Sequence, residues 1–256
     1  MYNTRSTPPY GEANVKYQAK YNDLESGETL YPGLSPGENM MRLGFIRKVY
    51  GILATQMVVT TAMVALFQFQ PGLRDSVVEM PGLMTAAAFG PLIGMIPLYC
   101  YRHSHPMNLV MLSLWTLCIA LTTSVVACFY QGPIVLEALF ITAVVTVSLT
   151  AYTFMGAKKG QDFGYLGPML FAGLMALIIG GFLQIFFPMG EFTHFLFALA
   201  GAGIFSMYIV YDTNELIQRY SVDEYVWASV GLYLDIINLF IRMLEILQYL
   251  QGGNNE

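Results

Sequence analysis

Seven long apolar runs constrain this chain more than any other feature of its sequence. Each has about the 20 residues that a helix needs to cross the hydrocarbon core of a bilayer. The composition agrees, because 55% of the residues are hydrophobic and only 11% are charged, against about 25% in soluble domains. The sequence therefore predicts an all-α polytopic membrane protein, a bundle of seven transmembrane helices. The runs are Val49–Phe69, Met80–Tyr101, Pro106–Phe129, Pro133–Met155, Phe163–Phe187, Phe192–Tyr211 and Tyr225–Leu250.

The segments outside these runs divide the chain into three parts. Residues 1–40 are rich in Pro, Gly, Tyr, Asn and acidic residues and show no hydrophobic periodicity. Such a segment cannot bury enough apolar area to offset its backbone entropy, so we expect a disordered cytosolic tail. Residues 41–250 form the transmembrane domain, and residues 251–256 form a short C-terminal tail. No basic stretch exceeds two residues, which argues against a nucleic-acid partner.

The distribution of Lys and Arg predicts the orientation. If the N-terminus is cytosolic, seven basic residues flank the cytosolic ends of the runs and only Arg74 lies on the other side. Because cytosolic flanks carry the excess of basic residues, we expect a cytosolic N-terminus. Seven spans then place the C-terminal tail on the opposite side, whereas a re-entrant seventh run would return it to the cytosol. The seven residues are Arg42, Arg47, Lys48, Arg102, Lys158, Lys159 and Arg219.

Small residues predict where helices meet. The fifth run contains Gly173, Gly180 and Gly181, and the sixth contains Gly201 and Gly203. Such residues allow two backbones to approach closely in a membrane. We therefore expect the fifth and sixth helices at the centre of the bundle.

Two carboxylates, 23 residues apart, lie at the end of one run and inside the next: Asp212 and Asp235. A charge at the centre of a bilayer costs about 2.5–3.5 kcal/mol even on the mildest scale, so a residue of this kind usually has a function. The depths of the two side chains match if the sixth helix continues to about Ile217 and the seventh begins near Trp227. The alternative for Asp212 is a capping or snorkelling residue at the membrane surface.

The chemistry of this pair suggests a latch. Two carboxylates that lie close together cannot both ionise cheaply, so a shared proton is expected. Carboxylate oxygens also suit Ca²⁺, although two residues fall short of its usual six to eight ligands. We therefore expect Asp212 and Asp235 to contact a partly hydrated calcium ion in transit, with calcium as a transported ion and no bound cofactor.

Three further polar residues are candidate accessories. Asn238 lies three residues after Asp235 on the same helix face and could hydrogen-bond to whatever the pair binds. Arg242 either pairs locally with Glu245, the interpretation we favour, or reaches back to Asp235. Glu137, near the outer end of the fourth run, is either an interfacial residue or an outer cation ligand.

The motifs of soluble enzymes are absent, since the sequence has no phosphate-binding glycine loop, nucleophile elbow or His-Glu-x-x-His. We therefore expect a protein that is not an enzyme. An intramembrane aspartyl protease is the less favoured alternative, because those enzymes also place aspartates in their sixth and seventh spans. They require Gly-x-Gly-Asp before the second aspartate, however, and Tyr233 occupies the second glycine position here.

Four segments together resemble the transmembrane Bax-inhibitor motif family, and most closely its lifeguard branch: Gly44–Leu53, Ala151–Phe154, Tyr211–Thr213 and Tyr233–Phe240. The resemblance extends over residues 41–250. It implies a seven-helix bundle with Asp212 and Asp235 paired at its core. Members are described as pH-sensitive calcium leak channels of internal membranes that dampen cell death. Bacterial relatives have a basic latch residue in the second span, where this chain has no Lys or Arg before Arg102.

We therefore expect a pH-sensitive calcium leak channel that modulates calcium homeostasis and suppresses cell death. The expected partners are the lipid bilayer, calcium and protons, together with cell-death regulators or receptors in the membrane. The alternative is a non-conducting scaffold that regulates apoptosis through protein partners. The expected location is the endoplasmic reticulum, the Golgi or another endomembrane, with the plasma membrane as a further candidate.

Overall fold

The structure is a computed structural model that describes residues 29–70, 72–74, 77, 80–102, 104–187 and 190–252. Within these ranges it consists of seven long α-helices and one short 3-10 helix, η1 (Gly164–Leu166), and it has no strand. The predicted all-α fold is therefore confirmed. The long helices are α2 (Pro36–Phe69), α4 (Pro81–Cys100), α5 (Met107–Ala127), α6 (Gly132–Lys158), α7 (Gly167–Phe186), α8 (Glu191–Gln218) and α9 (Tyr225–Gly252).

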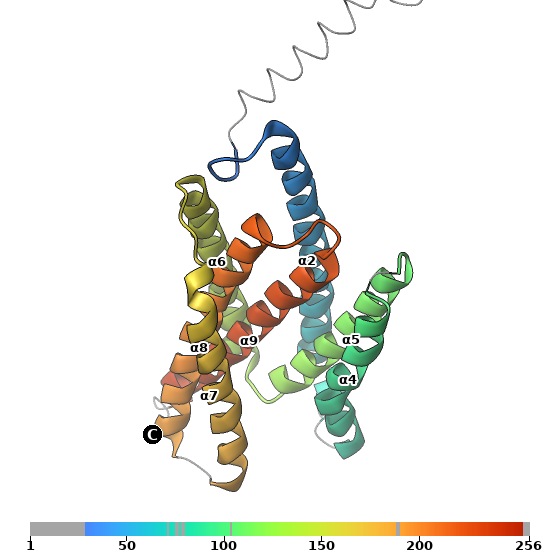
Figure 1. Ribbon diagram of the computed structural model, residues 1–256. Coiled ribbons are helices and arrows are strands. Elements are labelled where there is room, and N and C mark those ends of the chain that lie inside the picture. The colour runs from blue at the N-terminus through green and yellow to red at the C-terminus, as the bar shows by residue number, and fades with distance from the viewer. Residues whose placement is uncertain are drawn as a thin grey trace, which may run out of the picture.

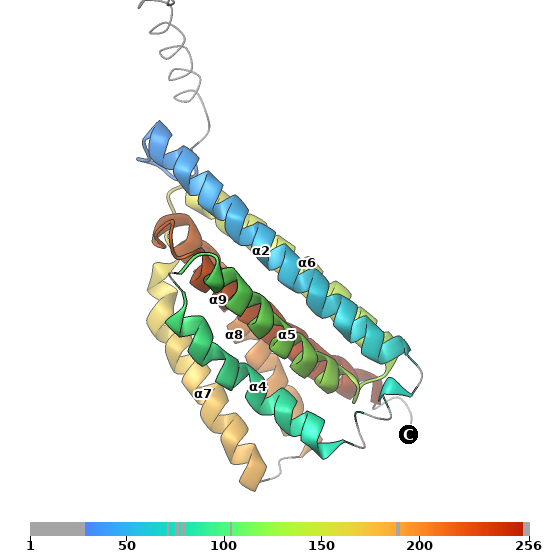
Figure 2. The ribbon, with the colours of Figure 1, turned by 90° about the vertical axis from the view of Figure 1, so that its right-hand side faces the viewer.

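The helices run alternately up and down (Figures 1 and 2). We call the side on which α2 begins the proximal face and the opposite side the distal face. Within the described ranges, the connections α4–α5, α6–α7 and α8–α9 lie at the proximal face. Six helices, all except α9, are long and apolar enough to cross a membrane. The chain is a multi-pass membrane protein.

Helix α9, which is not among these six, nevertheless crosses the whole bundle. Its last turns contact the first turns of α8 and α6, which begin at the distal face. Tyr249 stacks on Phe195 with 4.4 Å between ring centroids, and Gln251 donates a hydrogen bond of 2.7 Å to Glu137. The end of α9 therefore lies at the distal face, and the re-entrant alternative is wrong.

The centre of the bundle is α9, which packs against α2, α5, α6 and α8. The prediction that the fifth and sixth helices are central is correct for α8 and wrong for α7. Only Leu170 and Leu177 of α7 are buried among its described side chains. Its glycines serve the contact with α8, since a Cβ at Gly173 would lie 3.1 Å from Ile204 and one at Gly180 would lie 2.7 Å from Phe197. An apolar helix can face lipid, whereas α9 carries ionisable groups that are better accommodated inside.

Helix α2 begins earlier than the first apolar run. Ser35 and Glu38 form a capping box at its first turn, which satisfies backbone N–H groups that have no partner within the helix. The amide of Leu30, a buried residue, donates a hydrogen bond of 3.1 Å to the side chain of Asn39. The expected boundary at residue 40 therefore falls inside α2. The prediction of disorder for residues 1–28 lies outside the described residues.

Candidate functional site

The structure brings Asp212 of α8 and Asp235 of α9 together, with their carboxyl groups within hydrogen-bonding reach. Helix α8 continues to Gln218, as the matching of depths required, so Asp212 lies inside the helix and not at its end. Helix α9 begins at Tyr225, two residues before the start near Trp227 that an equal depth of the two aspartates assumed. Asp235 therefore lies about 15 Å along α9 at 1.5 Å per residue.

A glycine makes room for this contact. Gly231 lies one turn before Asp235 on α9, and a Cβ at this position would overlap Oδ2 of Asp212. The carboxyl group of Asp212 therefore rests directly on the backbone of α9. The sequence reasoning missed this residue, although its spacing of four residues from Asp235 places both on one face of the helix.

The pair is shielded from solvent on the α9 side. Asp235 is 6% exposed, and its Oδ2 has no hydrogen-bond partner within the part of the chain that the structure describes. Asp212 is half-buried, with Tyr208 and Glu215 as electrostatic neighbours. Ionised carboxylates only accept hydrogen bonds, so two of them in contact need a proton or a cation between them. The arrangement can therefore hold a proton or contact a passing cation.

The described residues contain no group of three or more His, Cys, Asp or Glu side chains that could hold a metal ion. A cation at Asp212 and Asp235 would therefore take its remaining ligands from water or from backbone and neutral side-chain oxygens. Such an ion would be held loosely, since Ca²⁺ normally has six to eight oxygen ligands.

The three candidate accessory residues have other contacts. Asn238 donates a hydrogen bond of 2.8 Å to the carbonyl of Leu234 in its own helix. Arg242 forms an ion pair of 2.7 Å with Glu245, which confirms the local pairing. Glu137 lies at the distal face and accepts from Gln251, as described above. In the described structure, the contacts of these side chains are with groups other than the aspartate pair.

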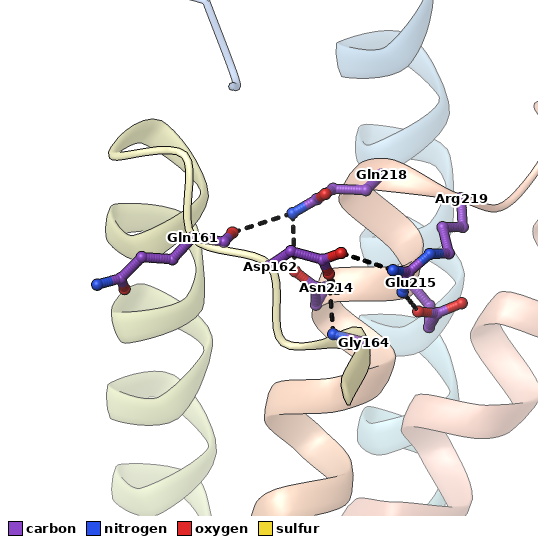
Figure 3. Close-up of polar contacts among 7 residues, drawn as sticks. All are labelled: Gln161, Asp162, Gly164, Asn214, Glu215, Gln218 and Arg219. Atoms are coloured by element: carbon purple, nitrogen blue, oxygen red, sulfur yellow. Dashed lines mark hydrogen bonds and ion pairs between the residues drawn. The ribbon is translucent and has the colours of Figure 1, made fainter. Parts of the chain in front are cut away.

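A polar network at the proximal face was not predicted from the sequence (Figure 3). Asp162, in the connection between α6 and η1, accepts hydrogen bonds of 2.8 Å from the Gly164 amide and the Asn214 side chain. Its second oxygen forms an ion pair of 2.6 Å with Arg219, which also pairs with Glu215. The pKa of the Asp162 carboxyl lies below its usual value. The main cause is the hydrogen bond from the Gly164 N–H, and the next is the hydrogen bond from Asn214.

This network explains why α8 is longer than its apolar run. Gln218 donates hydrogen bonds of 3.1 Å to the Gln161 carbonyl and 2.8 Å to the Asn214 side chain. The last two turns of α8 are thereby tied to the α6–α7 connection, and Asn214 is only two residues from Asp212. The network therefore positions the part of α8 that carries the candidate site.

These features define the class of the protein: a polytopic helical membrane protein with a carboxyl pair inside its bundle, between the last two helices. Comparison with known proteins specifies the family. Residues 42–252 match the family model described as inhibitor of apoptosis-promoting Bax1. The chain belongs to this Bax inhibitor family.

The relatives also support the lifeguard branch. The chain is 46% identical over 255 residues to the BI1-like protein of Arabidopsis thaliana, covering 96% of this chain and 99% of that protein. It is 42% identical to protein lifeguard 4 of Mus musculus, covering 81% and 86%. It is 40% identical to the Golgi anti-apoptotic protein of Vaccinia virus (strain Lister), with the same coverage. The predicted resemblance is confirmed.

Proposed function

We propose that this protein suppresses cell death by letting calcium leak across an internal membrane, under control of a latch formed by Asp212 and Asp235. The observation that carries the proposal is the contact between two carboxyl groups inside a membrane bundle. The relative named Golgi anti-apoptotic protein supports the cell-death role. The aspartates lie in the segments that resemble the family motifs.

The latch works through one proton. When it is present, one carboxyl donates to the other and holds α8 against α9. When it is lost, two negative charges about 4 Å apart repel by about 4 kcal/mol at an effective dielectric constant of about 20. The hydrogen bond between the carboxyl groups, about 1.5–3 kcal/mol, is lost at the same time. The two helices then separate, and the flux rises as the pH rises.

The basic groups near the site do not provide an alternative latch partner. The groups that act electrostatically on Asp212 or Asp235 include Glu215 and the hydroxyl of Tyr208, neither of which is cationic near neutral pH. Arg219, directly after α8, is engaged with Asp162 and Glu215, and Arg242 of α9 is engaged with Glu245. A shared proton is therefore the simplest means of holding the pair together.

Calcium flux in vesicles tests this proposal. Purified protein is reconstituted around a calcium dye, and flux is measured from mildly acidic to mildly alkaline pH. Wild-type flux is expected to rise with pH. Asp212→Asn and Asp235→Asn are expected to abolish this rise, because an amide donates to the remaining carboxylate at every pH. Asp223→Asn, an exposed loop residue at the proximal face, is the matched control and should behave as wild type.

Two outcomes would favour other functions. If the wild type carries no calcium but co-purifies with a membrane partner, the protein is a scaffold. If both aspartate variants keep the wild-type flux and its pH dependence, the latch is wrong. A protease is disfavoured because the fully buried Tyr233 occupies the glycine position such enzymes require. Cleavage of a model transmembrane substrate would restore that alternative.

We also propose an endomembrane location with the proximal face in the cytosol. Supporting this orientation, the proximal ends of the helices carry seven basic residues, against Arg74 near the distal face. The Golgi in the viral relative's name supports the location. A fluorescent fusion identifies the membrane, and protease protection of an N-terminal tag determines the side.

A further inference from the structure

A cavity of about 790 Å³ lies between α2 and α6, and neither Asp212 nor Asp235 lines it. Figure 1 shows these two helices standing apart, and Figure 2 shows both in one layer with α9 in the layer beside them. The wall on α2 extends from Tyr50 to Val64, which is about 20 Å at 1.5 Å per residue. Phe140 and Val147 of α6 line the cavity and are also exposed on the surface of a membrane helix. The cavity is therefore elongated and bordered by residues that face lipid.

The lining excludes a charged ligand. None of the 19 residues that line the cavity is charged. A carboxylate or phosphate group would lose its hydration there without gaining a countercharge, which is strongly unfavourable. The volume is within the range of about 300–1,000 Å³ that small-molecule sites occupy. The cavity fits a neutral molecule with a large apolar body.

Two threonines on α6 indicate that this molecule also has a polar group. Several threonine hydroxyls in these helices donate to the carbonyl four residues earlier, as Thr60, Thr123 and Thr153 do. Thr142 and Thr146 line the cavity one turn apart, and their hydroxyls have no partner in the described part of the chain. Thr142 is only 3% exposed. A buried hydroxyl of this kind favours a ligand with which it can hydrogen-bond.

The proximal end of the cavity is polar as well. The hydroxyl of Tyr50 faces those of Thr150 and Thr213, and the Tyr50 and Thr213 hydroxyls also lack a hydrogen-bond partner within the described residues. Hydrogen-bonding groups therefore occur both at this end and at mid-length, about 12 Å apart along α6 from Thr142 to Thr150. A plain hydrocarbon chain would leave the Thr142 and Thr146 hydroxyls unsatisfied.

We propose that the cavity between α2 and α6 binds a sterol-type lipid, a neutral molecule with a rigid apolar body and hydroxyl or carbonyl oxygens, recognised by Thr142, Thr146 and Tyr50. The volume divided by the length leaves a cross-section of about 40 Å², which suits a fused ring system better than one extended chain. The lipid-facing border allows the ligand to enter from the bilayer. This site does not depend on the proposed channel activity.

Photolabelling with a competitor pair tests the proposal. Purified full-length protein in detergent is labelled with a photoreactive sterol. Cholesterol is then compared, as competitor, with cholestane, which has the same rings and no hydroxyl. Cholesterol should compete about tenfold better on the wild type, the effect of about 1.4 kcal/mol of hydrogen bonding. The double variant Thr142→Val/Thr146→Val should lose this preference. Thr153→Val, whose hydroxyl bonds within α6, is the matched control and should keep it.

A second variant tests the cavity itself. Ala143 lines the cavity on α6 and is exposed on the lipid side, so Ala143→Trp should obstruct the cavity and abolish labelling while the protein stays monodisperse. Equal competition by cholesterol and cholestane on the wild type would mean that ordinary bilayer hydrocarbon fills the cavity. Unchanged labelling of a folded Ala143→Trp protein, or better competition by a diacylglycerol than by cholesterol, would also overturn the proposal.

Discussion

The substitution Gly231→Ala tests whether contact between Asp212 and Asp235 holds the last two helices together. The added methyl group would overlap Oδ2 of Asp212, and the short side chain of Asp212 must move to avoid it. The backbone of α9 need not change, because alanine is a better helix former than glycine. The variant therefore removes the contact between the carboxyl groups while keeping both aspartates.

The magnitude follows from two opposing contributions. Replacing glycine by alanine inside a helix stabilises it by about 1 kcal/mol. Loss of a hydrogen bond to a charged group destabilises by about 1.5–3 kcal/mol. Gly203→Ala, on α8, is the matched control, because a Cβ there meets no described atom within 4 Å. Both variants gain the same helix propensity from replacing glycine by alanine, so this contribution cancels between them. Gly231→Ala should therefore be less stable than Gly203→Ala by about 1.5–3 kcal/mol.

Thermal unfolding in detergent and calcium flux in vesicles measure the two consequences. A difference of this size corresponds to several degrees in Tm for a chain of this length. In vesicles, Gly231→Ala should conduct at an acidic pH where the wild type and Gly203→Ala are closed. If the two glycine variants unfold at the same temperature and conduct equally, Gly231 does not position Asp212 and the latch geometry described here is wrong.

Three further substitutions address other parts of the bundle. Tyr233→Phe removes a buried 2.6 Å hydrogen bond to Thr60 of α2 and should lower the free energy of unfolding by about 1 kcal/mol. An unchanged Tm would contradict this. Asp162→Asn removes the charge that pairs with Arg219 and should destabilise by at most about 1 kcal/mol, because the pair is exposed. Since the pKa of Asp162 is lowered on folding, the wild type should be more stable than Asp162→Asn at neutral pH and should lose this advantage as the pH falls through that pKa. A difference in Tm between the two proteins that stays constant with pH would refute this. Gly201→Ala places a methyl group 2.8 Å from Nε of Arg242 and should destabilise by about 1–3 kcal/mol through overpacking, whereas an increase in Tm would show that Arg242 moves aside freely.

The sequence by itself determined the features that depend on local spacing. Seven apolar runs of membrane length predicted seven helices, because a helix satisfies its backbone within one segment. The three-residue spacing of Arg242 and Glu245 predicted their ion pair, since it brings side chains together on one helix. The positions of Asp212 and Asp235 also identified a candidate pair, although their match in depth required α8 to be longer than its apolar run.

Only the tertiary structure decided which faces meet. The apolar pattern could not distinguish the peripheral α7 from the central α9, because lipid and a membrane-protein interior are similarly apolar. The length of α8 depends on Asp162, more than fifty residues away in sequence, which binds the polar end of that helix. The role of Gly231 depends on a side chain from another helix, and the cavity depends on α2 and α6 standing apart. Contacts between distant segments are set by packing, which local spacing does not encode.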